Sequence, residues 1–399
     1  MSEAAVAGPS RRRQVPYARN RSNLRPPLEA EAIEGADAYS VLRDDWQRIA
    51  DLQGGAILFQ THELLSAWTR HFPSKRLVTI VVRDRGRPVL IWPLTIERQF
   101  LVRVACGAGA PIGQYGEVLL DPDIDGIAAF EAALEVLKAS VRPDLVVIER
   151  VRADSALRAV LHDAAPVCWA EAAPFTDLSQ GADSAIEALK PSAMRKQRKR
   201  VRRFQKQGRV RFGLATDPGE AEAWLNDALD LKRAWLKATG RVSRAFVRAE
   251  SGECLAELAR TLWRDGRQPR MIVARLSLDG KAAAYEAGFR HGDVFYVYLR
   301  AFAPELAVLG PGNVLTEHML RWCAENGIGR YDMMAPRSRN KSEWQSSEVA
   351  VLDFALPMTP GGSLFMHAGI KRLGPALRAA FYALPTPLRS MLAGLTIRA

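Results

Sequence analysis

The chain has 399 residues, of which 48% are hydrophobic and 25% are charged, and its formal net charge is +12. This length fits two domains better than one core, and the composition is typical of a soluble globular protein. No uncharged run approaches the ~20 apolar residues of a membrane helix, so the sequence argues against a membrane-spanning protein.

The cysteines and histidines show no pattern of a metal or redox site. The four cysteines, at positions 106, 168, 254 and 323, are far apart, and the six histidines form no HExxH-like motif. We therefore expect a reducing compartment and no metal. The first residues, MSEAAVAGPSRRR, lack the apolar core of a signal peptide. A cytoplasmic protein is the resulting prediction.

The positive charge is concentrated in three segments. Residues 1–27 carry a net charge of +5, residues 195–211 carry ten Lys or Arg and no acid, and residues 354–399 carry five Lys or Arg and no acid. These segments account for +20, so the rest of the chain has a net charge of −8. The basic character therefore belongs to local segments that could meet an anionic partner.

The pattern of residues predicts a mixed α/β fold in four parts. Residues 1–38, rich in Arg, Pro and Ala without periodicity, are expected to form a disordered basic leader. An α/β domain is expected over 39–175, with a helix after Thr61 and a β-hairpin turning at Arg85-Gly86. Residues 359–399 are expected to form a basic amphipathic helical tail.

The second domain is predicted over 176–358. A very basic helix occupies 192–208, and two further helices precede three strands that turn at Asp279-Gly280 and His291-Gly292. A glycine loop, LGPGN, then leads into a helix over 314–326 and a strand over 329–335. The domain is expected to end in a strand over 349–356.

The Gly310-Pro311-Gly312 corner is the first candidate binding element. Glycines let backbone N–H groups approach an anion, and a helix start adds unpaired N–H groups and about half a positive charge. A phosphate or diphosphate is the expected ligand of such a corner. An ordinary turn explains the same residues and is the alternative.

The order of several blocks resembles a known superfamily. The blocks are FQTHELLSAW (59–68), SAMRKQRKRVRRFQKQG (192–208) and the segment 294–336, from VFYVYLRAF to YDMMAP, followed by Lys341 and Trp344. Together they resemble the acyl-CoA N-acyltransferase (GNAT) fold, more narrowly the CelD/BcsL family associated with cellulose biosynthesis, and more distantly the FemABX transferases. The resemblance implies tandem GNAT-like domains, of which the second carries the cofactor site.

The resemblance also implies a co-substrate and its contacts. Acetyl-CoA or another acyl-CoA would lie between the strands 294–302 and 329–335. The implied cofactor-binding residues are Val297, Leu299, Gly310, Gly312, Asn313 and Val314. The implied substrate-binding residues are Tyr296, Lys341 and Trp344. The chain reads RSRN at 337–340, where relatives tend to show acidic residues and a tyrosine.

Acyl transfer needs a group that removes a proton from the acceptor and one that protonates the thiolate. Glu286 lies in an otherwise apolar strand and is a candidate base, with a salt bridge to Arg290 or Arg300 as the alternative. Asp332 is a second candidate, with capping or pairing to an Arg as its alternative. Tyr296 and Tyr298 are candidate acids, with core packing of strand tyrosines as the alternative. Strand alternation predicts that Tyr296, Tyr298 and Arg300 share one face.

The sequence leaves two main hypotheses for function. The first is an acyltransferase that moves an acetyl or longer acyl group from acyl-CoA to an amine or hydroxyl, with an acceptor in exopolysaccharide (cellulose-type) or cell-envelope synthesis. The second is a non-catalytic accessory protein with a degenerate fold, which the RSRN departure and the basic tail favour. The tail suits a peripheral position on an anionic membrane, with packing on its own domain as the alternative. Nucleic acid is the least favoured partner, because no aromatic interleaving or zinc pattern accompanies the basic helix.

Overall fold

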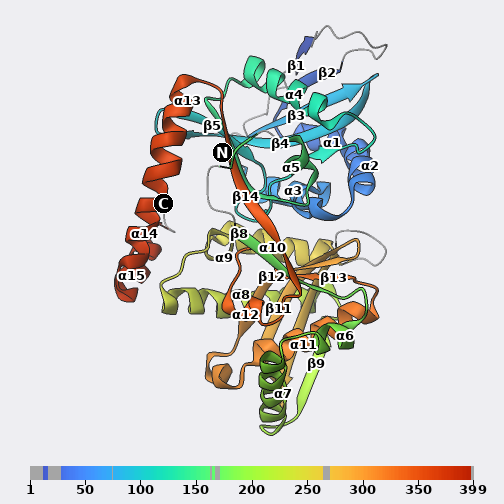
Figure 1. The fold of residues 1–399 in the computed structure, drawn as a ribbon, viewed down its shortest axis with the longest axis vertical. Helices are drawn as coiled ribbons and strands as arrows, with labels where there is room; N and C mark the ends of the chain where they lie inside the picture. The colour runs from blue at the N-terminus through green and yellow to red at the C-terminus, as the bar shows by residue number, and fades with distance from the viewer. Residues whose placement is uncertain are drawn as a thin grey trace, which may run out of the picture. The chain divides into compact units, whose positions relative to one another are not determined.

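The computed structural model describes residues 12–16, 28–73, 75–161, 164–166, 171–263 and 270–396. The chain divides into two compact units, each of which is built from two stretches of sequence. Unit 1 contains residues 1–169 and 352–374, and unit 2 contains residues 170–351 and 375–399 (Figure 1). Two α/β units are what the length and the mixed pattern predict, although each unit also takes up part of the C-terminal stretch that was expected to be a separate tail.

Unit 1 is a mixed sheet with helices. Its strands run in the order β1-β2-β3-β4-β5-β7. The strands are β1 (Arg12–Pro16), β2 (Glu29–Glu34), β3 (Arg76–Asp84), β4 (Arg87–Gln99), β5 (Val102–Gly107), β6 (Leu119–Leu120) and β7 (Leu145–Arg152). The helices are α1 (Asp37–Val41), α2 (Arg43–Gln53), a 3-10 turn (Gly55–Gln60), α3 (His62–His71), α4 (Gly126–Val136) with a π-helical extension (Leu137–Val141), α5 (Ala156–Val160) and α13 (Pro360–Phe365), which a π-helical segment (Met366–Leu373) continues.

The β3–β4 hairpin of unit 1 confirms its sequence prediction. Arg85 and Gly86 both take positive φ angles, 51° and 80°, as a two-residue hairpin turn requires. The apolar residues of these strands enter a core that includes Trp92 and Phe130, whose ring centroids lie 5.1 Å apart. Helix α4 packs against β2, β3 and β4 over this core (Figure 1).

The expected disordered leader over 1–38 is wrong for part of its length. Strand β2 pairs antiparallel with β3, and its Ala30, Ala32 and Ile33 are each 4% exposed. The segment EAEAIE was assigned to the leader on composition, although its alternation of glutamate and alanine over 29–32 has the two-residue period of a strand. The remaining leader residues, 1–11 and 17–27, lie outside the described residues.

Unit 2 is a second mixed sheet, with the strand order β14-β8-β13-β12-β11-β10-β9. The strands are β8 (Glu171–Asp177), β9 (Val210–Leu214), β10 (Arg270–Leu278), β11 (Lys281–His291), β12 (Val294–Phe302), β13 (Arg330–Asp332) and β14 (Ser347–Pro357), of which residues 347–351 belong to this unit. The helices are α6 (Ala182–Glu187), α7 (Pro191–Gln205), α8 (Pro218–Thr239), α9 (Arg244–Val247), α10 (Ala249–Thr261), a 3-10 turn (Pro304–Leu309), α11 (Pro311–Glu325), α12 (Arg339–Ser342), α14 (Gly374–Ala383) and α15 (Thr386–Thr396).

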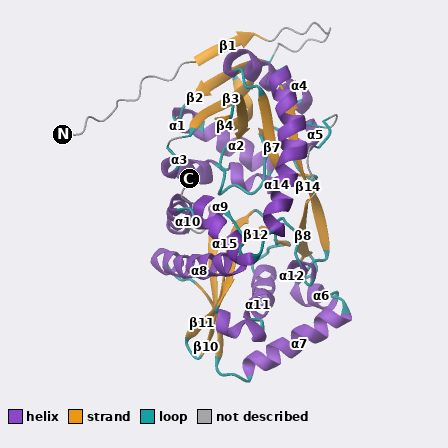
Figure 2. Cartoon of the chain, turned by 90° about the vertical axis from the view of Figure 1, so that its left-hand side faces the viewer, coloured by secondary structure: helices purple, strands orange, loops and turns teal. Residues whose placement is uncertain are grey.

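Helices cover both faces of the β10–β11–β12 meander. Helices α8 and α10 pack on one face, where the Tyr285 hydroxyl donates to Asp227 of α8 at 2.7 Å. Helix α11 packs on the other face through residues that share a core with β11 and β12 (Figure 2). The two turns of the meander lie at Asp279-Gly280 and Gly292, where φ is positive, as the sequence predicted.

A β-bulge in β12 makes the predicted alternation wrong. Gly288 of β11 pairs with Val297, and Glu286 pairs with Arg300, so β12 contains one residue more than β11 between these pairs. Arg300 therefore faces α11, where it hydrogen-bonds Thr316. Tyr298 faces the opposite side, where its ring lies 5.8 Å from that of Phe246 in α9.

The C-terminal stretch is helical, as its amphipathic pattern predicted. Helix α15 packs against α8, and the Ser390 hydroxyl donates to the Lys237 carbonyl at 2.9 Å. Among the described residues, no helix combines the length and the apolar character that crossing a membrane requires.

The bulge has a steric basis at Gly288, which yields a stability prediction. A methyl group there would lie 2.4 Å from the Tyr296 carbonyl oxygen and 2.5 Å from Phe295 Cζ. We expect Gly288→Ala to lower the free energy of unfolding by about 1–3 kcal/mol, the range for overpacking a core. Urea unfolding followed by tryptophan fluorescence measures this.

Gly213→Ala is the matched control, because Gly213 also lies in a strand and a methyl group there meets no atom within 4 Å. Equal unfolding midpoints for the two variants would contradict the close packing at the bulge.

Candidate functional site

Strands β12 and β13 separate after a short parallel pairing. Among the described residues, this pairing ends at Tyr296 and Asp332. The chain then turns away, since the Met333 N–H donates to Pro174 of β8 at 2.9 Å and Met334 takes a φ of 59°. In the part of the chain that the structure describes, no further strand pair joins residues 297–302 of β12 to β13. A strand edge of this kind can bind an extended ligand.

A helix start lies directly after this edge. Helix α11 begins at Pro311, three residues earlier than predicted, and Gly310 takes a φ of 67° as its N-cap. Proline fits the first helical position because it has no N–H to leave unpaired. Gly310, Gly312 and Asn313 are partly exposed. The corner therefore keeps the N–H groups and the dipole of a helix start within reach of an anion.

The basic helix α7 packs beside this corner. A methyl carbon built on Gly310 would lie 3.4 Å from both Cδ and Nε of Arg200. Glu343 forms ion pairs with Arg200, at 2.8 Å, and with Lys196. Burial raises the pKa of Glu343, but these two cations outweigh burial and leave the pKa below its usual value. The structure thus joins two features, the basic run and the glycine corner, that the sequence presented separately.

Asn313 and Trp344 bind each other. The Trp344 indole N–H donates to Asn313 Oδ1 at 2.9 Å, and Trp344 is 1% exposed. Gln197 of α7 donates to the Asn313 carbonyl at 3.2 Å. The predicted substrate-binding residue Trp344 and the predicted cofactor-binding residue Asn313 therefore hold the start of α11 in place.

A buried polar network lies behind the separated strands. Arg300 Nε donates to Glu286 Oε2 at 2.8 Å, and its Nη2 donates to Thr316 at 2.9 Å and to Tyr331 Oη at 3.0 Å. The Tyr331 hydroxyl donates to Glu286 Oε1 at 2.7 Å. Burial disfavours the charged form of Arg300, but Tyr331 and Glu286 outweigh it and raise the pKa of the guanidinium.

This network decides between the two interpretations of Glu286. The Glu286 side chain is fully buried, and both of its oxygens accept hydrogen bonds. The salt bridge to Arg300, which the sequence analysis offered as the alternative to a catalytic base, is present. The Glu286 carboxylate is neutralised by Arg300. It links β11 to β12 and β13 near the point where β12 and β13 separate.

Asp332 and Lys341 make local contacts. Asp332 is buried, its Oδ1 accepts the Met334 N–H at 2.8 Å, and Arg330 lies 3.7 Å from its Oδ2. Lys341 donates to the carbonyls of Met334 and Pro336 at 2.8 and 2.9 Å. Both side chains therefore stabilise the turn that ends β13.

The apolar residues predicted to bind the cofactor are buried in unit 2. Val297, Leu299 and Val314 are 7%, 1% and 2% exposed. Their side chains belong to the interior, so at Val297 and Leu299 only backbone groups at the unpaired edge could reach a ligand.

An aromatic and cationic cluster lies on the α8 side of β12. Tyr298 packs edge-on against Phe246 and Phe289. Lys232 of α8 places its Nζ 4.6 Å from the Trp235 ring centre and 5.7 Å from that of Phe246. Burial, together with Arg241 and Arg300, lowers the pKa of Lys232 to about 8.

Sequence reasoning missed Lys232, Thr316, Tyr331 and the role of Arg200. No spacing signal relates them, because their contacts join α7, α8, α11 and β13 across long stretches of chain. Only the observation that Glu286 needed a partner pointed toward this network.

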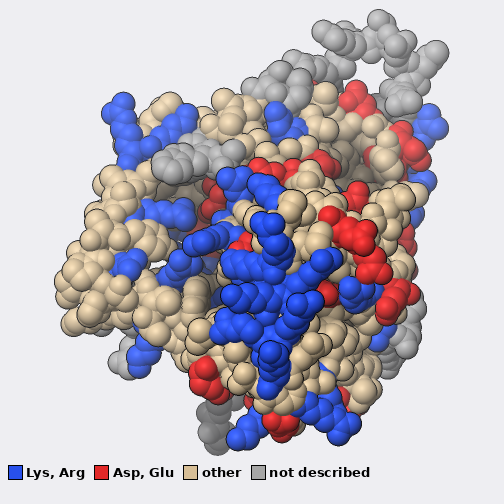
Figure 3. All heavy atoms as spheres, turned by 60° about the horizontal axis from the view of Figure 1, so that its bottom comes forward, with Lys and Arg blue, Asp and Glu red and all other residues tan. Residues whose placement is uncertain are grey.

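Lysine and arginine side chains gather on the surface around α7. The exposed cations of this segment have no acid among them in sequence, and Figure 3 shows Lys and Arg forming a broad patch when this end of the molecule is turned forward. The exposed cations are Arg195, Lys196, Arg198, Lys199, Arg202, Arg203, Lys206, Arg209 and Arg211.

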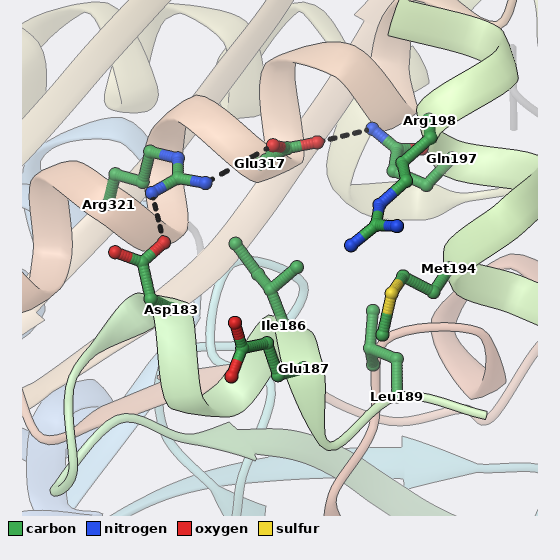
Figure 4. A pocket seen from close by; sticks show the side chains of 9 residues that line it. All are labelled: Asp183, Ile186, Glu187, Leu189, Met194, Gln197, Arg198, Glu317 and Arg321. Atoms are coloured by element: carbon green, nitrogen blue, oxygen red, sulfur yellow. Dashed lines mark hydrogen bonds and ion pairs between the residues drawn. The ribbon is translucent and has the colours of Figure 1, made fainter. Parts of the chain in front are cut away.

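A small cavity lies between α6, α7 and α11. Its volume is about 140 Å³, and Figure 4 shows Arg321 linked to Asp183 and Glu317, with Gln197 bonded to the same glutamate. Ligand pockets usually measure roughly 300–1,000 Å³. The cavity is therefore too small for an acyl-CoA. Among the described residues, no group of three or more His, Cys, Asp or Glu could hold a metal ion.

A family comparison agrees with this geometry. Residues 191–344 match the family model described as "Acetyltransferase (GNAT) domain". Over these residues unit 2 is similar to a GNAT domain. The matched stretch contains the bulged β12, the start of α11 and the end of β13.

Two solved structures are similar to this chain at low identity. A structure titled "Crystal structure of FemX" is 13% identical with a TM-score of 0.55, and the match covers 82% of this chain and 98% of that one. A "Tandem GNAT protein from the clavulanic acid biosynthesis pathway" is 13% identical with a TM-score of 0.47, covering 83% and 99%. A comparison with curated proteins gives no match. The FemX match shows the mixed α/β fold that the sequence predicts.

The buried network yields a second stability prediction. We expect Arg300→Met to lower the free energy of unfolding by about 3–5 kcal/mol, because it leaves the Glu286 carboxylate buried without its counterion. Urea unfolding at pH 7 measures the change.

Arg290→Met serves as the control, since Arg290 lies on the same strand as Glu286 and its Nε contacts the Gly292 carbonyl at 3.5 Å on the surface. That variant should stay within about 1 kcal/mol of the parent, as surface substitutions usually do. Equal losses of unfolding free energy in the two variants would show that the Glu286–Arg300 ion pair contributes no more to stability than a surface arginine does.

Proposed function

We propose that unit 2 transfers an acyl group from acyl-CoA to an amine or hydroxyl acceptor. In this proposal, the CoA diphosphate binds at the start of α11, on the N–H groups of Gly312 and its neighbours beside Arg200. The pantetheine arm lies along the unpaired edge of β12 at Val297–Leu299. Acetyl-CoA is the simplest such co-substrate.

The observation that carries the proposal is the edge of β12 beyond its pairing with β13, which lies next to the helix start at Gly310. Both elements belong to the segment that matches a GNAT domain model. An extended amide chain can pair with a free strand edge, and a diphosphate is attracted to a helix N-terminus. The two binding elements follow each other along the chain, in the order needed for a single CoA molecule.

For the chemical step, we propose Tyr298 as the proton donor. The acceptor attacks the thioester carbon, the carbon–sulfur bond breaks, and the departing thiolate takes the phenolic proton. The acceptor's own proton passes to solvent or to a base. Glu286 and Asp332 were the other candidates, but Glu286 is paired with Arg300, and Asp332 holds the Met334 N–H. Tyr298 is the bulged residue beside the unpaired edge.

The acceptor class is a finer part of the proposal. The resemblance to CelD/BcsL proteins in the order of the sequence blocks supports a glycan-type acceptor in exopolysaccharide or cell-envelope synthesis. Tyr296 and the turn held by Lys341 would border it. In the alternative, unit 2 is a non-catalytic accessory protein, and the RSRN segment then serves only to start α12, where Ser338 accepts the Lys341 N–H at 3.4 Å.

Binding of acetyl-CoA tests the proposed site. We expect the wild-type chain to bind acetyl-CoA in calorimetry and Gly312→Val to bind it at least about tenfold more weakly, because the side chain blocks the approach of the diphosphate to the backbone (a ~1.4 kcal/mol loss). Gly213→Val is the control, in open space on β9. Unchanged affinity in Gly312→Val would contradict the site, and no binding by the wild type would favour the accessory protein.

The chemical step is tested with tyrosines on two neighbouring strands. With hydroxylamine as acceptor, Tyr298→Phe should slow CoA thiol release by about tenfold or more while acetyl-CoA affinity stays the same. Tyr285→Phe removes a hydroxyl from the neighbouring strand β11, where Tyr285 is 3% exposed, and should have little effect on the rate. Equal rates in the two variants would remove Tyr298 from the mechanism.

A further inference from the structure

Helix α14 is largely exposed in the part of the chain that the structure describes. No residue of this ten-residue helix is buried, and its sequence, GPALRAAFYA, is mostly apolar. Helix α14 directly continues α13 and the π-helical segment that precedes it. Because most helix stability in proteins comes from packing an apolar face, an exposed apolar face of this kind is suited to binding a surface.

The exposed side chains of α14 and α15 are large and apolar. Leu377 is 60% exposed, Tyr382 46%, Leu388 49% and Met391 66%. Leu377 and Phe381 of α14 are four residues apart, which places them on one face of the helix, and Leu384 follows directly after the helix end. Phe381 and Leu384 are themselves only partly buried. The two helices thus present an apolar strip to solvent.

The charge of this segment has one sign. Residues 354–399 contain no Asp or Glu. Arg378 is exposed and has no acidic partner among the described residues, and Arg389 lies 5.9 Å from the Tyr382 ring centre. An acid-free segment that combines apolar and cationic side chains complements a layer of apolar chains with anionic headgroups.

We propose that α14 and α15 bind an anionic phospholipid bilayer, lying in its interface with the Leu377–Phe381–Leu384 strip inserted. Helix α15 connects this surface to the body of unit 2, because Ser390 donates to the Lys237 carbonyl at the end of α8. The proposal is independent of the acyltransferase proposal, since none of its residues belongs to the candidate site.

Sedimentation of the full chain with vesicles tests the proposal. We expect co-sedimentation with vesicles of 30% phosphatidylglycerol in phosphatidylcholine and much weaker binding to phosphatidylcholine alone. Leu377→Glu should weaken binding at least about tenfold, because it places a charge in the apolar strip. Leu52→Glu is the matched control: Leu52 is also a helical leucine, 47% exposed, and lies on α2 in unit 1.

A third variant separates this surface from the basic patch on α7. Lys199→Gln/Arg202→Gln/Arg203→Gln removes three exposed cations of α7 and should leave binding to these vesicles within about twofold. Loss of binding in that variant with retention in Leu377→Glu would overturn the proposal. So would no vesicle binding by the wild type, or light scattering that shows a dimer lost in Leu377→Glu, which would assign the strip to a second copy of the chain. Calorimetry with acetyl-CoA should give the same affinity for Leu377→Glu and wild type.

Discussion

The ion pair between Glu286 and Arg300 is the contact on which the architecture of unit 2 depends. It lies beside the bulge of β12 and, among the described residues, beyond the point where the pairing of β12 with β13 ends. Arg300 adds side-chain bonds to β11, α11 and β13 there. Because an unpaired buried charge is very costly, this network favours one arrangement of the separated strands.

The edge of β12 where it separates from β13 and the start of α11 together form one candidate binding site. The unpaired edge of β12 leads through the 3-10 turn at Pro304–Leu309 to Gly310, and α11 returns along the opposite side of the sheet from α8. The glycine conformation at Gly310 and the proline that follows allow the helix to begin immediately after the turn. Arg200 then adds a fixed positive charge, which Glu343 orients.

Two basic segments, α7 and the pair α14 and α15, differ in the type of interaction that dominates at their surfaces. On α7 the cations surround a helix whose Phe204 and Gln197 are buried against unit 2, so their effect is electrostatic and depends on salt. On α14 and α15 few cations accompany exposed leucine, tyrosine and methionine, so the apolar contribution dominates. Net charge alone would not distinguish the two surfaces.

Sequence by itself determined much of the local structure. Asp279-Gly280, Gly292 and Arg85-Gly86 place three hairpin turns, because only a few residues accept the φ angles that such turns need. The order of blocks between 192 and 344 gave the GNAT-like fold, and the charge distribution identified α7 and the tail. Strand β2 was not predicted, because residues 1–38 were interpreted from their composition alone, although EAEAIE shows an alternating pattern.

Only the tertiary structure decided which side chains form hydrogen bonds and ion pairs with one another. One extra residue in β12 moved Arg300 to the face opposite that of Tyr298, and no pattern in a single sequence announces a bulge. The bonds from Arg300 to Tyr331 and from Trp344 to Asn313 each join residues about thirty positions apart in sequence. Local propensity acts over a few residues, whereas a buried charge is satisfied by whichever side chain the packed fold brings within hydrogen-bonding distance.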